Sequence, residues 1–252
     1  DPENVWLMYE TPFALAEDGR GGVFVSGMGG GQIYYFGPDE KVRFAFGQKD
    51  LSRVTGIDVD SVDGKVYVVD SNQNSVVVFG LDGEKLSQWG QRGNNEGEFN
   101  FPLDVAVGPD GNIYVLDALN FRVQVFNPDG QFIREFGKVG LQVGGFQLPK
   151  GIAVDASGHV YVTDSRAHRV LIFDLKGRLL QVLGGYGQIN SGGISPGAFN
   201  LPAGIATDKH DSIWIADTLN RSIHHYQYLN EKYLLQRPIV KEEVYYPGSN
   251  EN

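Results

Sequence analysis

Short apolar runs separated by polar turns fill most of the chain. The stretch from residue 102 to residue 137 shows the pattern most clearly, because its apolar runs are about four to six residues long and rich in β-branched and aromatic side chains. Asp110-Gly111 and Asp129-Gly130 stand between such runs, where a tight hairpin needs a residue with positive φ. The pattern predicts four short antiparallel strands in this stretch.

The same unit recurs along the chain in register. One column is a glycine after Phe46, Trp89, Phe136 and Leu183, and a second column is a run of the type Tyr-Val-x-Asp that ends at Asp70, Asp117, Asp164 and Asp217. Successive aspartates of that column are 47, 47 and 53 residues apart. Phe24-Val25-Ser26-Gly27 forms an earlier copy with glycine in place of aspartate. The chain therefore contains five copies, at about residues 11–47, 53–90, 101–137, 148–184 and 201–231.

A unit of four strands and about 45 residues cannot bury both of its faces alone. We therefore expect the copies to pack face to face about a common axis, as the four-stranded blades of an all-β β-propeller that spans residues 11–231. Five copies favour five blades, with a strand at 5–10 of the N-terminal segment (residues 1–10) completing the fifth blade. Six blades are the alternative, in which leftover strands at 232–236 and 243–246 of the C-terminal tail (residues 232–252) take part.

The unit resembles the NHL repeat of β-propeller proteins. Pro149-Lys150-Gly151-Ile152-Ala153-Val154 and Asn120-Phe121-Arg122-Val123 match its pattern, and the likeness extends over about residues 11–230. The first and fifth copies depart from it, with Gly27 in the aspartate column and Asp211 in place of a turn glycine. The resemblance implies a scaffold that binds a protein or glycan partner, or alternatively a metal-dependent lyase or hydrolase with a divalent cation in the central channel.

Residues 226–233 also resemble the C-terminus of exported bacterial NHL propellers, some of which accompany multihaem cytochromes as assembly or structural partners. The chain begins at Asp1 rather than at a methionine, so either an exported precursor was trimmed or the sequence starts at a chosen boundary, and we favour export. The expected location is therefore periplasmic or extracellular, and the expected partner is a protein of an extracytoplasmic complex.

The amino-acid composition excludes several kinds of site and partner. The 34 glycines among 252 residues indicate many tight turns, which favours an all-β protein, and the absence of cysteine excludes disulfides, thiolate nucleophiles, zinc–thiolate sites and iron–sulfur clusters. The net charge of −10 disfavours nucleic acid as a partner. No apolar run is long enough for a transmembrane segment.

The repeat also predicts where a partner can bind. When the strands of a unit are called a, b, c and d in chain order, the b–c turns and the d–a crossovers emerge on one face. The crossovers are residues 91–100, 138–147 and 185–200, and the turns carry side chains that differ between copies. The predicted binding residues are Asn72, Asn74, Asn120, Phe121, Arg122, Arg166, His168, Arg169, Asn220, Arg221 and, in the third crossover, Tyr186.

Four aspartates at the ends of the b strands can in principle gather around a calcium ion, but they are interpreted as structural. We expect each carboxylate to accept N–H groups of the turn that follows it, with Arg122 and Arg169 within reach. His168 with Asp164 and His225 is the combination that could hold zinc in the enzyme alternative. We expect no resident cofactor and no catalytic residue, since the chain has no Gly-x-Ser-x-Gly elbow.

Overall fold

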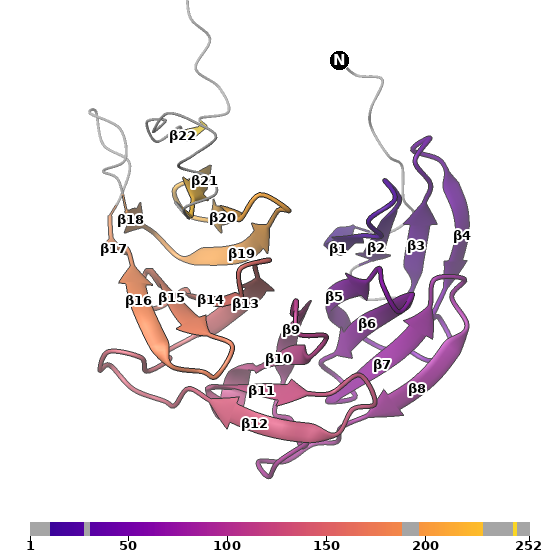
Figure 1. Ribbon diagram of the computed structural model, residues 1–252, viewed down its shortest axis with the longest axis horizontal. Helices are drawn as coiled ribbons and strands as arrows, with labels where there is room; N and C mark the ends of the chain where they lie inside the picture. Colours follow the sequence, from indigo (N-terminus) through magenta and orange to yellow (C-terminus); the bar gives the residue numbers. More distant parts are fainter. Residues whose placement is uncertain (1–10, 28–30, 188–196, 229–243, 246–252) are drawn as a thin grey trace, which may run out of the picture. The chain divides into compact units, whose positions relative to one another are not determined.

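A computed structural model describes residues 11–27, 31–187 and 197–228, together with the backbone of a strand at 244–245 (Figure 1). These residues form five four-stranded antiparallel sheets and one two-stranded sheet. In the described residues the one helical element is a 3₁₀ turn, η2 (Ala118–Asn120). None of these elements is a helix long and apolar enough to cross a membrane.

The first three sheets follow the predicted repeats strand by strand. The first sheet contains β1 (Pro12–Glu17), β2 (Val23–Gly27), β3 (Ile33–Phe36) and β4 (Val42–Phe46). The second contains β5 (Val54–Asp60), β6 (Lys65–Asp70), β7 (Ser75–Gly80) and β8 (Lys85–Trp89). The third contains β9 (Pro102–Val107), β10 (Ile113–Asp117), β11 (Arg122–Phe126) and β12 (Phe132–Phe136). In each sheet, neighbours in sequence are neighbours in space.

The fourth sheet contains β13 (Pro149–Val154), β14 (His159–Asp164), β15 (Arg169–Asp174) and β16 (Leu179–Leu183). The fifth contains β19 (Pro202–Thr207), β20 (Ser212–Asp217), β21 (Ser222–Gln227) and β22 (Val244–Tyr245). Between them, β17 (Gly185–Tyr186) and β18 (Ala198–Phe199) pair in parallel.

The fourth strand of the fifth sheet comes from the C-terminal tail. Tyr245 and Val244 pair with Ile223 and His224 of β21, so β22 takes the place that one of our arrangements gave to residues 5–10. This pairing satisfies backbone groups that β21 would otherwise present as an open edge. The strands predicted at 5–10 and 232–236 lie outside the described residues.

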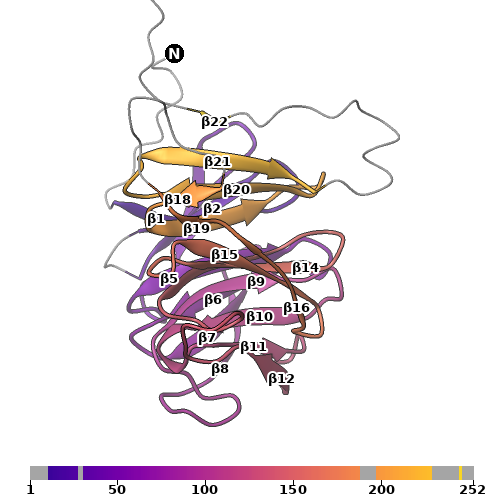
Figure 2. The ribbon, with the colours of Figure 1, turned by 90° about the vertical axis from the view of Figure 1, so that its left-hand side faces the viewer.

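The chain divides into two compact units, one formed by Asp1–Val107 with Gly111–Glu135 and the other by Gly108–Asp110 with Phe136–Asn252. In the first unit the a strands β1, β5 and β9 are neighbours, and in the second unit β13 lies beside β19 (Figures 1 and 2). Successive sheets of a unit thus pack face to face, which is the arrangement of propeller blades.

Aromatic columns of the repeat form the core between sheets. The aromatic residue that ends a d strand packs on the phenylalanine of the next c strand: the ring centroids are 5.0 Å apart for Phe46 and Phe79, 4.4 Å for Trp89 and Phe126, and 5.0 Å for Phe136 and Phe173. All three c-strand phenylalanines are buried. These contacts form apolar core between neighbouring sheets.

Candidate functional site

The aspartate at the end of each b strand fastens the preceding crossover to its sheet. Asp117 accepts the Asn100 N–H at 2.7 Å, and Asp217 accepts the Asn200 N–H at 2.8 Å. Asp70 and Asp164 accept pairs of N–H groups in the same way, from Ser52 and Arg53 and from Gln147 and Leu148. All four side chains are buried. Their oxygens are engaged by backbone donors, which is a structural role.

The source of those donors differs from our expectation in one respect. Only Asp70 also accepts N–H groups from the turn that follows it, those of Asn72 and Gln73 at 3.0 Å. Asp117 and Asp217 instead bind the side chains of Asn120 and Asn220 in that turn. In the described residues no three His, Asp or Glu side chains converge as metal ligands.

Arg122 and Arg169 donate hydrogen bonds to backbone carbonyls of the crossovers. Arg122 is 8% exposed; its Nε donates to Asp117 at 2.8 Å and its Nη2 donates to the carbonyls of Asn95 and Glu98 at 2.8 and 3.0 Å. Arg169 donates from Nη2 to the Gly145 carbonyl at 2.8 Å, the counterpart of Glu98 in the next crossover. Both arginines therefore face inward and shape the crossovers.

A column of left-handed residues follows in the b–c turns. Asn74, Phe121, His168 and Arg221 have φ values of 52°, 55°, 54° and 52°. Asn74 Oδ1 accepts the Phe101 N–H at 2.8 Å, and His168 Nδ1 accepts the Leu201 N–H at 3.2 Å. Two different residue types thus make the same bridge to the start of the next sheet. Side-chain variation in this column reflects alternative ways to make a structural contact.

The predicted binding residues accordingly separate into two groups. Asn74, Asn120, Arg122, Arg169 and Asn220 are bound internally, and Phe121 and His168 are half-buried. Asn72, Arg166, Arg221 and Tyr186 are exposed; Tyr186 is 64% exposed and lies edge-on to His168 with ring centroids 4.7 Å apart. Leu119 and Leu219 occupy the same repeat position as Asn72 and Arg166, two residues after the b-strand aspartate, and are also exposed. The sequence did not mark these two leucines as binding residues.

The first two long crossovers have the same pattern of backbone hydrogen bonds. In residues 91–100 the Phe99 N–H donates to the Gln91 carbonyl and the Gly93 N–H donates to the Phe99 carbonyl, at 2.8 and 2.9 Å. In residues 138–147 the same bonds join Phe146 to Lys138 and Gly140 to Phe146, at 2.8 and 3.1 Å. Phe99 and Phe146 are fully buried in equivalent positions. The two crossovers are therefore a matched pair.

Their exposed side chains differ at three equivalent positions. The first crossover carries Arg92, Asn94 and Glu96, whereas the second carries Val139, Leu141 and Val143 at the same positions. The three aliphatic side chains are 63%, 79% and 72% exposed. We call them the aliphatic trio. The polar residues of the first crossover show that this backbone does not need the trio to fold.

The five four-stranded antiparallel sheets make the chain a β-propeller protein. The family model of the NHL repeat matches residues 99–126 and 146–173, which confirms the resemblance of the repeat units. No curated protein sequence matches the chain.

Solved structures with the same fold have different functions. A chain in the crystal structure of the nidogen/laminin complex is 17% identical, with a TM-score of 0.68 over 96% of this chain and 83% of that chain. A streptogramin B lyase is 14% identical, with a TM-score of 0.66 over 89% of this chain and 68% of that chain. The virginiamycin B lyase of Staphylococcus aureus, bound to quinupristin, is 15% identical, with a TM-score of 0.65 over 94% and 71%. Likeness at this identity establishes the fold alone.

Proposed function

We propose that this propeller is a scaffold that docks a protein partner through its b–c turn and crossover face. The observation that carries the proposal is the aliphatic trio. Val139, Leu141 and Val143 are exposed to solvent, whereas the first crossover has charged and polar side chains at the same backbone positions. Exposed apolar side chains grouped on one loop are typical of a surface that another molecule covers.

Neighbouring groups suit the rim of such a surface. Arg169 holds the second crossover to the fourth sheet. It follows the turn that carries exposed Arg166 and His168, and the His168 ring contacts Tyr186 of the third crossover. Arginine and tyrosine are enriched at protein interfaces. A protein fits this face better than a glycan, because the trio offers no hydrogen bonds to sugar hydroxyls. Residues 226–233 support an exported, periplasmic or extracellular scaffold, with a multihaem cytochrome complex as one suitable setting.

The b-strand aspartates do not favour the enzyme alternative, because backbone and side-chain donors already engage their oxygens. Elemental analysis of the purified protein separates the two functions. A stoichiometric, tightly held calcium or zinc ion would favour the metal-dependent lyase or hydrolase.

The docking function is tested with a photoreactive amino acid placed at position 141 or, as the matched control, at position 94. We expect a protein from the native source to cross-link at position 141 and not at position 94, and mass spectrometry to identify it. Equal cross-linking of that protein at both positions, or none at position 141, would contradict docking centred on the aliphatic trio.

A further inference from the structure

The interface between the fourth and fifth sheets departs from the repeat on both of its sides. At three earlier d-strand ends the residue before the glycine is Phe46, Trp89 or Phe136, but at the fourth it is Leu183. The residue that faces it on the next c strand is still aromatic, Tyr226. A smaller side chain at this column leaves space that a ring occupies elsewhere.

The glycine of the c–d turn that covers this ring elsewhere also has no counterpart in the sequence of the fifth copy. A Cβ atom built at Gly83, Gly130 or Gly177, in the c–d turns, would lie 2.7, 2.5 or 2.5 Å from the ring of Phe46, Trp89 or Phe136. These glycines therefore close the outer side of the ring. In the fifth sheet the c strand ends at Gln227 and the d strand begins at Val244, with no glycine between them in the sequence.

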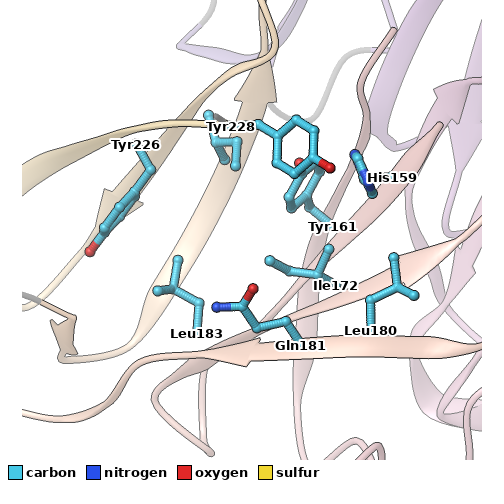
Figure 3. Close-up of a pocket in the computed structure, with 9 residues that line it drawn as sticks. His159, Tyr161, Ile172, Leu180, Gln181, Leu183, Tyr226 and Tyr228 are labelled. Atoms are coloured by element: carbon cyan, nitrogen blue, oxygen red, sulfur yellow. The ribbon is translucent and has the colours of Figure 1, made fainter. Parts of the chain in front are cut away.

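A cavity of about 340 Å³ lies at this place (Figure 3). Figure 3 shows the rings of His159, Tyr161, Tyr226 and Tyr228 on one side and Leu180, Gln181 and Leu183 of β16 on the other. Tyr161 and Ile213 are buried, whereas Tyr228 and Leu180 are 39% and 52% exposed and form the rim. An apolar cavity of about 150 Å³ is enough to bind benzene, so this one has room for two fused rings.

His159 gives the cavity a polar group of fixed orientation. Its Nδ1 lies 2.8 Å from Asp155 Oδ2, and the Tyr161 hydroxyl donates to the same oxygen at 2.7 Å. Because a carboxylate only accepts hydrogen bonds, Nδ1 donates to Asp155, and in that tautomer Nε2 is a hydrogen-bond acceptor. A ligand with an N–H or O–H group on its ring would satisfy that acceptor.

We propose that this cavity is a binding site for a free aromatic molecule of about the size of indole that carries a hydrogen-bond donor. The molecule takes the place of the Phe or Trp side chain that the other interfaces supply. This site is independent of the docking face, because it is lined by Tyr228 and by residues of β14, β15, β16, β20 and β21 and not by the crossovers.

Calorimetric titration of the whole chain with indole tests the site, with benzofuran as an isostere that lacks the N–H donor. We expect saturable binding of one indole per chain and binding of benzofuran that is about five- to tenfold weaker, as one lost hydrogen bond implies. Absence of saturable indole binding would overturn the proposal. Equal affinity for benzofuran would overturn the role of His159.

Leu183→Trp restores the ring that the repeat places elsewhere and should fill the cavity. We expect this variant to lose indole binding and to melt at the same temperature as the wild type or higher. Leu183→Phe is the second variant, with the same expectation, in case the larger indole side chain prevents folding. Leu119→Trp, on an exposed turn, is the matched control and should bind indole like the wild type. Wild-type indole affinity in a folded Leu183→Trp or Leu183→Phe variant, or a lowered melting temperature in both, would contradict the proposed site.

Discussion

Arg166 lies in a b–c turn and Arg122 is the first residue of the c strand β11, and their side chains have different surroundings. The Arg122 guanidinium is buried and bound to Asp117, to Glu135 and to two crossover carbonyls, whereas Arg166 is exposed. In the sequence both stand among the residues predicted to bind a partner. Only the fold distinguishes the one that holds a loop in place from the one that is free to meet a partner.

We predict that Arg122→Ala lowers the free energy of unfolding by about 3–5 kcal/mol, because it leaves the Asp117 carboxylate buried without its charged partner. Arg166→Ala should change it by less than about 0.5 kcal/mol, as for other exposed residues. Urea denaturation of the two variants measures the difference. Similar stability for both would mean that the Arg122 interactions do not hold the crossover.

Asp58 is the residue that should make stability depend on pH. Burial raises its pKa to about 6, although the N–H groups of Val107 and Val59 bind its carboxylate. The folded chain therefore keeps the Asp58 proton up to about pH 6, whereas the unfolded chain releases it near pH 4. Between these values the folded state binds more protons, so the stability contributed by Asp58 falls as the pH rises.

We predict that the unfolding free energy of Asp58→Asn, relative to wild type, rises by about 1–2 kcal/mol from pH 4 to pH 6 and is constant above pH 7. Denaturation of both proteins across this range gives the difference, in which other titrating groups cancel. A difference that is independent of pH would show that the Asp58 pKa is the same in the folded and unfolded states.

Some residue-scale contacts could not be predicted from the sequence. Asn74 bonds to Phe101 and His168 bonds to Leu201, partners in the next sheet that are 27 and 33 residues away. An asparagine and a histidine in one column look like variation for recognition, although both make the same bridge. The donors to the b-strand aspartates come from crossovers for the same reason, since packing of strands brings distant backbone next to them.

At the scale of single elements, the c–d turns limit how close one sheet comes to the next. Gly130 has a φ of 79°, and a Cβ atom there would lie 2.5 Å from the Trp89 ring. Gly111, in the a–b turn of the same sheet, has a φ of 73° and no atom within 4 Å of its Cβ position. An alanine at Gly111 would therefore cost only the strain of the left-handed backbone, whereas an alanine at Gly130 would add the clash with Trp89.

We predict that Gly111→Ala lowers the unfolding free energy by about 1–2 kcal/mol, the cost of a left-handed backbone for an L-residue. Gly130→Ala should lower it by about 1–3 kcal/mol more, because its methyl group must displace Trp89. Thermal and chemical denaturation give both values. Equal effects of the two substitutions would mean that the Trp89 ring can move aside freely.

The ends of many b and d strands were predictable, because four b strands end at an aspartate and four d strands end just before a glycine. The d strand of the fifth sheet was harder to place, since β22 lies 17 residues after the end of β21 and does not follow a hairpin turn. The aliphatic trio also had a signal in the sequence. Aligning residues 91–100 with residues 138–147 sets Arg92, Asn94 and Glu96 opposite Val139, Leu141 and Val143.

At the scale of the whole molecule, the repeat makes the fold predictable and the function difficult to predict. Five similar sheets follow from the recurrence of the same columns, because identical units bury their faces on one another. Function depends on where copies differ, and most differences in the turns are structural. The informative departures are the aliphatic second crossover and the missing ring at Leu183, which are visible only when copies are compared position by position.

The most direct test of the docking function exchanges the trio for its own counterpart. The variant Val139→Arg, Leu141→Asn, Val143→Glu gives the second crossover the side chains of the first and leaves the net charge at −10. Calorimetry then compares the variant and wild type for affinity toward the protein that cross-links at position 141. Each buried aliphatic side chain contributes about 1.5–3 kcal/mol, so we predict at least about a hundredfold weaker binding. The melting temperature should be unchanged. Wild-type affinity in this variant would contradict docking through the crossover face.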